Sequence, residues 1–233
     1  MKWFFKQKVL KRILLILLML ILVLSIFLTF DNGTLVNSIR GEKENREATL
    51  YDGYCGGCHW TISDGGQLTI GAGVLENLAN SGDAPWYAHK NYIKNVYVNS
   101  GVKTNTQKCV GLFYGLNKCT TISMANLDTT TKSTPILSHF FEGCTVLTSL
   151  TLPTNFVTSS VTNTSHMFKD CQALTTLDVS NFVTSSVTNM NSMFMDCYAL
   201  TSITWGTFST ANVTDFGNLF SRRLFINSNR KSI

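Results

Sequence analysis

The second half of the chain repeats itself with a period close to 26 residues. The clearest copies are "FKDCQALTTLDVSNFVTSSVTNM" from Phe168 and "FMDCYALTSITWGTFSTANVTDF" from Phe194, and an earlier copy begins at Phe141 with one extra residue near Pro153. The anchoring aromatic residues are spaced 28, 27, 26 and 26 residues apart, at Phe113, Phe141, Phe168, Phe194 and Phe220. Such self-similarity predicts a stacked solenoid, in which each unit buries its apolar face only against its neighbours.

Each unit contains a strand signal, the pattern L-x-x-L-x-L. Its last two apolar positions are two residues apart, which is the period of a strand with one buried face. Threonine and serine fill the positions that such a strand turns outward, and threonine suits a half-exposed pleated surface. The pattern recurs at Ile93-Val96-Val98, Cys119-Ile122-Met124, Leu147-Leu150-Leu152, Leu174-Leu177-Val179 and Leu200-Ile203-Trp205.

The other half of each unit carries a helix signal. In "SVTNMNSMF", Thr188 or Asn189 would cap a helix ahead of Met190, Met193 and Phe194, which are at helical spacing. We therefore predict an α/β fold, a leucine-rich-repeat-like solenoid of about five units. Each unit would hold one short strand and one short helix or 3-10 segment.

The units resemble the 26-residue repeat of BspA-like leucine-rich-repeat surface proteins of bacteria. The signature of that repeat, x-M-F-x-x-C-x-x-L-x-x-L-D-L-S-N-F-x-T-S-x-V-T-N-M, is matched almost position by position from Met167 to Met190. The preceding segment "CHWTISDGGQLTIGAG" resembles the module found before such repeats, so the resemblance covers about Tyr54 to Phe220. It implies surface display and an adhesin-like or binding role, without naming a ligand.

An apolar stretch precedes the repeats, from Ile13 to Phe30, interrupted only by Ser25 and Thr29. Its 18 residues at helical rise approach the hydrocarbon thickness of a bilayer. Because no small-residue cleavage pattern precedes Asp31, an uncleaved signal anchor is favoured over a cleaved signal peptide. The basic residues before the stretch favour a cytoplasmic N-terminus. We expect a single-pass protein of the cell membrane with its repeats on the extracellular side.

The chain thus divides into five expected parts. They are a basic flank and transmembrane anchor (1–30), a polar linker (31–49), a β-rich N-terminal module with the first repeat strand (50–105), the 26-residue repeats (106–220), and a C-terminal cap or truncated tail (221–233). Beyond Phe220 only Ile226 matches an apolar repeat position, so no further strand of the same kind is expected. The run Leu224-Phe225-Ile226 is interpreted as a cap over the last unit, and the alternative is a truncated array.

Charge and motifs exclude two classes of function. The net charge of +5 resides in the N-terminal flank, and residues 31–220 sum to −4, which argues against a nucleic-acid partner. The sequence contains no G-x-S-x-G, phosphate-binding glycine loop or H-E-x-x-H motif. Asp170, Asp178 and Asp196 recur with the repeat, so they are interpreted as turn and surface residues rather than a general acid–base pair. We predict that the protein is not an enzyme.

The segment "CGGCH", with Cys55, Cys58 and His59, permits four readings. It satisfies the Cys-x-x-Cys-His pattern of c-type haem attachment, it could hold zinc if His59 and His89 were recruited, and it could be a redox pair. The hairpin signal that follows, around Asp64 to Gly66, favours a structural role as a disulfide or as free thiols. No cofactor or metal is therefore expected.

Three further cysteines, Cys144, Cys171 and Cys197, occupy one repeat position, where the first unit has Leu116. A position that accepts either leucine or cysteine is interior, so buried thiols are favoured over disulfides. His139 and His166 also share a repeat position. Two histidines on one surface can bind a metal, but Ser192 in the next unit favours solvated side chains.

The predicted function is binding or adhesion to an extracellular protein or glycan across the outward strand face. The alternatives are a structural or self-associating envelope protein and, as a minor one, a haem protein. The candidate contact residues are Thr148, Ser149, Thr151, Thr175, Thr176, Asp178, Thr201, Ser202 and Thr204.

Overall fold

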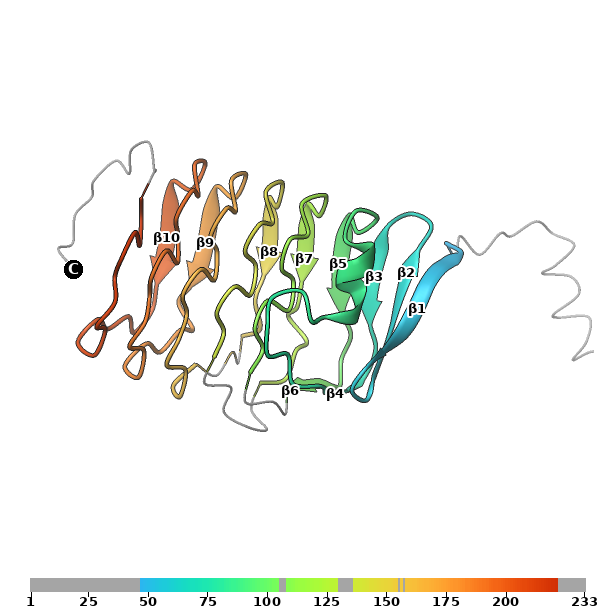
Figure 1. The fold of residues 1–233 in the computed structure, drawn as a ribbon, viewed down its shortest axis with the longest axis horizontal. Helices are drawn as coiled ribbons and strands as arrows, with labels where there is room; N and C mark the ends of the chain where they lie inside the picture. The colour runs from blue at the N-terminus through green and yellow to red at the C-terminus, as the bar shows by residue number, and fades with distance from the viewer. Residues whose placement is uncertain (1–46, 105–107, 130–135, 155, 157, 222–233) are drawn as a thin grey trace, which may run out of the picture. The chain divides into compact units, whose positions relative to one another are not determined.

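A computed structural model describes residues 47–104, 108–129, 136–154, 156 and 158–221 of the chain. They belong to one compact unit, Glu47–Ile233, and form a β-solenoid whose coils stack side by side (Figure 1). The expected anchor, nearly all of the linker and the expected cap over residues 224–226 lie outside the described residues. Within the described part, no helix is long and apolar enough to cross a bilayer.

The strands assemble into one large sheet and two pairs. The large sheet has the order β1-β2-β3-β5-β7-β8, with β1–β3 antiparallel and the rest added in parallel. The parallel pairs are β9 with β10 and β4 with β6. The bounds are Thr49–Cys55 (β1), Cys58–Ser63 (β2), Gln67–Ile70 (β3), Gly73–Leu75 (β4), Asn95–Val98 (β5), Val102–Thr104 (β6), Thr121–Ser123 (β7), Ser149–Thr151 (β8), Thr176–Val179 (β9) and Ser202–Trp205 (β10).

The strands lie where the sequence pattern predicts them, and equivalent residues stack from coil to coil. Leu68, Val96 and Ile122 are in register across β3, β5 and β7, and Leu177 is in register with Ile203. The ladder is interrupted between β8 and β9, in the unit from Phe141 that carries the extra residue. Because the period is constant, equivalent residues of successive coils lie next to each other, and each coil buries its apolar side chains against those of its neighbours.

A column of phenylalanine rings forms the centre of the core. Successive rings from Phe113 to Phe220 lie 5.8, 5.3, 5.6 and 5.2 Å apart, with interplanar angles of 20° or less. Stacked aromatic pairs contribute about 0.5–1.5 kcal/mol each beyond the area they bury. The number of residues between successive phenylalanines in the sequence is therefore the length of one coil, and the distance between their rings is the spacing of neighbouring coils.

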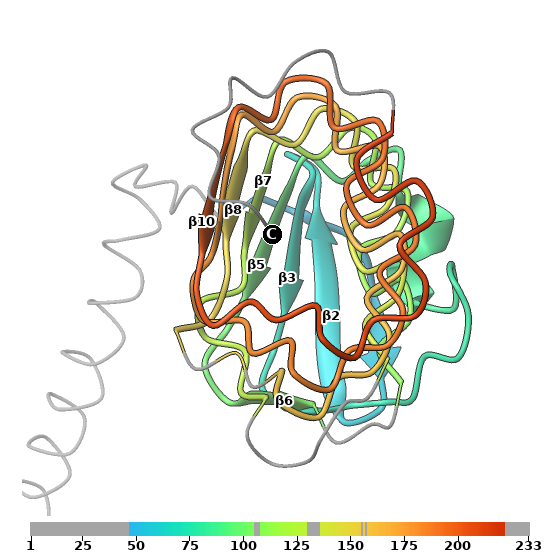
Figure 2. The same ribbon diagram turned by 90° about the vertical axis from the view of Figure 1, so that its left-hand side faces the viewer.

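The predicted α/β character is wrong, because the described repeats contain no helix. The helix of the described residues is a 3-10 segment outside the repeats, η1 (Pro85–His89). Two positions of each unit instead adopt left-handed backbone, with φ of 58° at His166 and 60° at Asp170 and similar values at their equivalents. Left-handed residues cannot continue a right-handed helix. Figure 2 shows the outcome, a wall of strands and an opposite wall of successive turns.

Backbone hydrogen bonds between coils replace those of the predicted helices. The amide N–H of Phe141 donates to the carbonyl of Met167 at 2.9 Å, and that of Phe168 donates to Met193 at 3.0 Å. Asn189, predicted as a helix cap, accepts the N–H of Asn191 on its Oδ1 at 2.8 Å and so closes a turn. The backbone is satisfied by stacking rather than by local helical bonds.

Residues 50–105 are β-rich, as expected, but they are not a separate module. Trp60, Ile62 and Leu68 belong to the same buried cluster as the repeat residues, and β3 pairs directly with β5. Trp86 of η1 donates its indole N–H to the Leu112 carbonyl at 3.0 Å and stacks on Phe113, the first ring of the column. This region therefore closes the N-terminal end of the solenoid, which a repeat array requires.

Candidate binding surfaces

All nine predicted contact residues are exposed; six lie on the outward face of β8, β9 and β10, and Thr148, Thr175 and Thr201 lie directly before these strands. In β9 the burial alternates, so Thr176 and Asp178 point outward while Leu177 and Val179 are buried. Thr176 is in register with Ser202, and Asp178 with Thr204. The structure aligns the residues of β9 and β10 in rows, while those of β8 align with β7 in the large sheet. Whether the rows bind a ligand stays a prediction.

Part of this face is fixed by its own hydrogen bonds. The hydroxyls of Thr148 and Thr201 donate to the carbonyls of Thr120 and Thr175, both at 3.2 Å. Asp178 accepts the N–H of Ser180 at 2.9 Å, and hydrogen bonding from Ser180 lowers the pKa of this carboxyl. The other side chains of the set make no hydrogen bond within the described part of the chain, which leaves these hydroxyls for a ligand: Ser149, Thr151, Thr175, Thr176, Ser202 and Thr204.

Tyr97 of β5 belongs to the same face and was missed by the sequence prediction. It lies in register with Thr69 and Ser123, and 42% of its surface is exposed. The signal was present, because the pattern Ile93-Val96-Val98 turns position 97 outward. The face therefore extends at least as far as β5 and includes an aromatic side chain.

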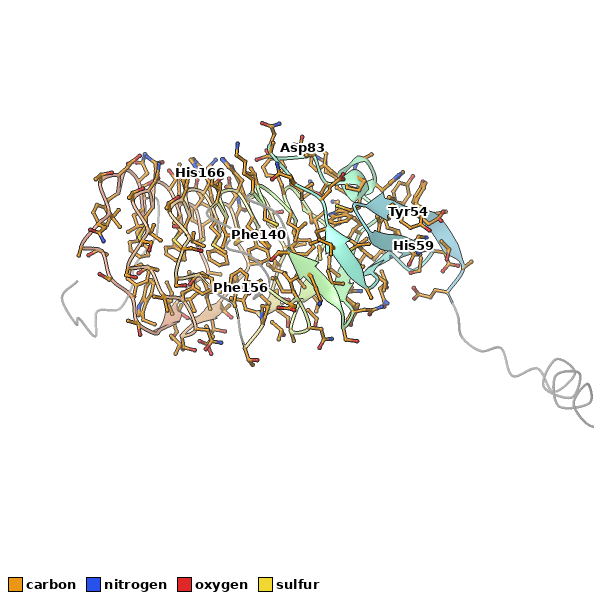
Figure 3. All side chains as sticks on the ribbon, turned by 90° about the horizontal axis from the view of Figure 1, so that it is seen from below. Tyr54, His59, Asp83, Phe140, Phe156 and His166 are labelled. Atoms are coloured by element: carbon orange, nitrogen blue, oxygen red, sulfur yellow. The ribbon has the colours of Figure 1, made fainter. Side chains whose placement is uncertain are left out.

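The Cys-x-x-Cys-His motif is split between the two faces of the sheet. Cys55 ends β1 and Cys58 begins β2, so the motif forms a hairpin turn whose two thiols are buried and free. Burial raises the pKa of Cys55 to about 12. His59 lies on the outer face, where its Nε2 is 3.3 Å from Asp52 Oδ2 and its ring is beside Tyr54 (Figure 3). These three side chains therefore do not converge on one ligand, and the geometry favours the predicted structural role.

The repeat cysteines form the buried column that their shared position predicts. Cys144, Cys171 and Cys197 are each 0% exposed, and their sulfurs are reduced thiols. Their thiols donate to the carbonyls of Phe113, Phe141 and Phe168 in the preceding coil, at 3.2, 3.3 and 3.0 Å. Burial raises the pKa values of Cys144 and Cys171 well above the usual range, so both stay protonated and unreactive at neutral pH.

The two repeat histidines are half-buried rather than solvated. Their rings stack at 4.7 Å with an interplanar angle of 9°. His139 also bonds Glu142 through Nδ1, and Lys169 Nζ donates to the same carboxylate at 2.9 Å. Burial and the neighbouring His139 lower the pKa of His166. Parallel rings do not aim their nitrogens at one point, and the described residues include no group of three potential metal ligands.

The fold and these surfaces define a β-solenoid of the leucine-rich-repeat class. Residues 109–232, more than half of the chain, match the family described as "Mycoplasma protein of unknown function, DUF285", and the chain belongs to this family. No curated protein matches the sequence.

Two solved structures are similar to the chain. A leucine-rich cell surface protein from Faecalibacterium prausnitzii A2-165 shares 20% identity over 74% of this chain and 52% of its own, with a TM-score of 0.39. A leucine-rich-repeat protein from Eubacterium ventriosum ATCC 27560 shares 17% identity over 63% of this chain and 41% of its own, with a TM-score of 0.35. The chain thus spans about half the length of the first. The predicted family resemblance is confirmed, while the fold described above rests on the chain's own strands and turns.

Proposed function

We propose that this protein is displayed outside the cell and binds an extracellular protein or glycan across its outward strand face. The observation that carries the proposal is the register of that face. Equivalent hydroxyls are held in register by the parallel pairs β7–β8 and β9–β10, so each part of the surface is rigid before any partner arrives. A preorganised surface loses little conformational entropy on binding.

The chemistry of the face suits a polar, repeating partner. Free hydroxyls of threonine and serine both donate and accept hydrogen bonds, and Tyr97 adds an apolar ring with a polar tip. Strands are spaced about 4.8 Å apart, so the same groups recur at a fixed interval along the solenoid. A glycan chain or an extended peptide offers matching groups at regular intervals.

Display outside the cell is supported by the sequence before the solenoid. The apolar stretch 13–30 follows five basic residues, a pattern typical of a signal anchor with a cytoplasmic N-terminus. Protease added to intact cells should then digest the solenoid and leave the anchor. A mature N-terminus near Asp31 would refute the uncleaved anchor.

The binding proposal is tested on arrays of glycans and purified extracellular proteins, with the full chain as the probe. Thr176→Lys and Thr204→Lys place a long charged side chain on the outward face, and Ser185→Lys makes the same change at an exposed turn position. The two face variants should lose binding while the Ser185 variant keeps it. If no partner is found, or if all three variants bind like the parent, the face is not a binding surface.

A second candidate is self-association through the C-terminal side of β10. Among the described residues β10 pairs only with β9, and Trp205 and Phe216 are 36% and 42% exposed. An open strand edge with exposed apolar side chains favours pairing with another chain. Concentration-dependent assembly that persists in Thr176→Lys would favour this candidate.

A further inference from the structure

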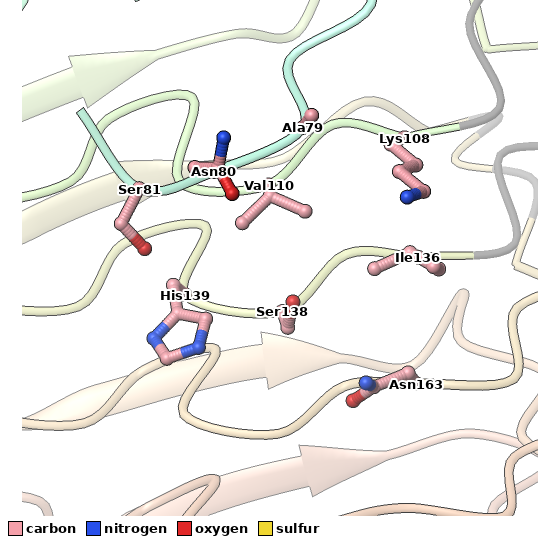
Figure 4. A pocket seen from close by; sticks show the side chains of 9 residues that line it. All are labelled: Ala79, Asn80, Ser81, Lys108, Val110, Ile136, Ser138, His139 and Asn163. Atoms are coloured by element: carbon pink, nitrogen blue, oxygen red, sulfur yellow. The ribbon is translucent and has the colours of Figure 1, made fainter. Parts of the chain in front are cut away.

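A pocket lies outside the strand face, and none of the nine predicted contact residues lines it. The pocket holds about 360 Å³ and is formed where the loop around Ser81 meets the coils that contain Lys108, Ile136 and Asn163 (Figure 4). Its volume is within the range of small-ligand sites. Residues far apart in the sequence thus contribute to one site.

Both walls of the pocket are fixed by hydrogen bonds. On one wall, Lys108, Ile136 and Asn163 are joined by parallel β-bridges, and Asn163 is held by the N–H of Ser165 on its Oδ1 at 2.8 Å. On the other wall, Asp83 Oδ2 accepts the backbone N–H of Asn80 at 2.8 Å and its side-chain amide at 3.2 Å. The pocket is therefore preformed, and little ordering is needed when a ligand enters.

The pocket presents one cation, Lys108, and has two carboxylates behind its lining, Asp83 behind Asn80 and Glu142 behind His139. Lys108 is exposed and has no ion-pair partner among the described residues. The nearest acid behind His139 is Glu142, whose charge is already compensated. Although burial acts to raise the pKa of Glu142, hydrogen bonds from His139 and Lys169 lower it. An anionic group that approaches Lys108 therefore meets Asp83 as the remaining acid, whose Oδ2 already accepts hydrogen bonds from Ala79 and Asn80.

The remaining lining groups are neutral and polar or apolar. Three polar groups of the lining make no hydrogen bond within the described part of the chain: the Ser81 hydroxyl, the Asn163 amide nitrogen and His139 Nε2. His139 uses its other ring nitrogen, Nδ1, to bond Glu142. Val110 and Ile136 supply an apolar patch beside them. A phosphate would call for several cations or an arginine fork, which the pocket lacks. A carboxylate on a ring with several hydroxyls matches all three kinds of group.

We infer that this pocket binds an acidic sugar, with its carboxylate on Lys108, its hydroxyls on Ser81, Asn163 and His139, and its C–H face on Val110 and Ile136. The site is separate from the proposed strand-face function. It adds a small-molecule specificity to a chain whose strand face would take a macromolecule.

The test is ligand-observed saturation-transfer NMR on the full chain in detergent micelles, with glucuronate, glucose and acetate as probes. Glucuronate should bind saturably and about tenfold more tightly than either glucose, which lacks the carboxylate, or acetate, which lacks the hydroxyls. Lys108→Gln should weaken glucuronate binding about tenfold, to the level of glucose. Lys118→Gln removes the same charge from an exposed position of the same coil and should change nothing.

Two further variants separate the possible failures. Ser81→Tyr fills the pocket and should weaken every sugar, with circular dichroism confirming that the fold is kept. Thr176→Lys, on the strand face, should bind glucuronate like the parent even if it loses its macromolecular partner. The inference is overturned if glucuronate gives no saturable signal, if acetate binds as tightly as glucuronate, or if Lys108→Gln binds as tightly as the parent.

Discussion

The buried thiol column gives a sharp stability prediction at Cys171. Its side chain is fully buried, and its thiol lies 3.3 Å from the Phe141 carbonyl, which already accepts the backbone N–H of Cys144 at 3.2 Å. In Cys171→Ser the oxygen would sit closer to Cβ than sulfur does, so it would lie farther than 3.3 Å from its acceptor. A buried hydroxyl with a poor hydrogen bond costs about 1–3 kcal/mol.

Cys171→Ala is the matched control. It removes the sulfur without burying a polar atom, and the carbonyl of Phe141 keeps its backbone partner, so the loss should be about 1 kcal/mol. For a domain of this size each kcal/mol corresponds to about 2–4 °C in Tm. Thermal unfolding followed by circular dichroism should rank the parent first, Ala second and Ser third.

Two results would refute this reasoning. A serine variant as stable as the parent would mean that the site accommodates a polar atom and is not an apolar column. Native thiol labelling of Cys171 at the rate seen after denaturation would mean that the side chain is accessible.

Three further predictions follow from the same structure. If Cys55 and Cys58 are structural, the purified protein should be colourless, and the double variant Cys55→Ala/Cys58→Ala should still bind the partner. An absorption band near the haem Soret position that survives denaturation would contradict this structural role. Deleting residues 222–233 should lower Tm and promote end-to-end association if Leu224–Ile226 cap the last coil, and no change in either would favour a truncated array. Because burial raises the pKa values of Cys119 to about 12 and of Cys144 and Cys171 further, the unfolded chain releases these protons first, above about pH 8.5. The free energy of unfolding, measured with urea, should therefore be unaffected by these thiols at pH 7 and should fall between pH 8.5 and 11. In the double variant Cys144→Ala/Cys171→Ala it should fall less steeply with pH. An equal slope in that variant would contradict the burial of these thiols.

The strands could be predicted because their signal is local. Alternation of Leu177 and Val179 with exposed Thr176 and Asp178 has the period of a strand, and the repeat places it in each unit. The same reasoning predicted that the nine candidate residues are exposed and that the repeat cysteines are interior. It stopped at β8, two coils after the β5 strand that carries Tyr97, because that strand lies outside the clearest repeats.

The turn segments could not be predicted in the same way. Met190, Met193 and Phe194 are all buried, but their spacing fits both a helix and a pair of tight turns. The left-handed residues that decide between the two are His166, Ser192 and Asp196 in the later units, although Gly115 and Gly143 stand at the position of Asp196 in the earlier units. Their strain is offset by hydrogen bonds to the next coil, which a single unit of sequence does not reveal. The pocket at Lys108 is invisible for the same reason, since it joins segments from four stretches of the chain.

Site-specific photo-crosslinking tests the central claim most directly, that the outward strand face is the binding surface. A benzophenone side chain is placed at Thr176, at Thr204 or at the turn position Ser185, and each full chain is irradiated with the partner identified on the arrays. Crosslinks are expected from positions 176 and 204 and none from position 185. Crosslinks from position 185 alone would contradict it.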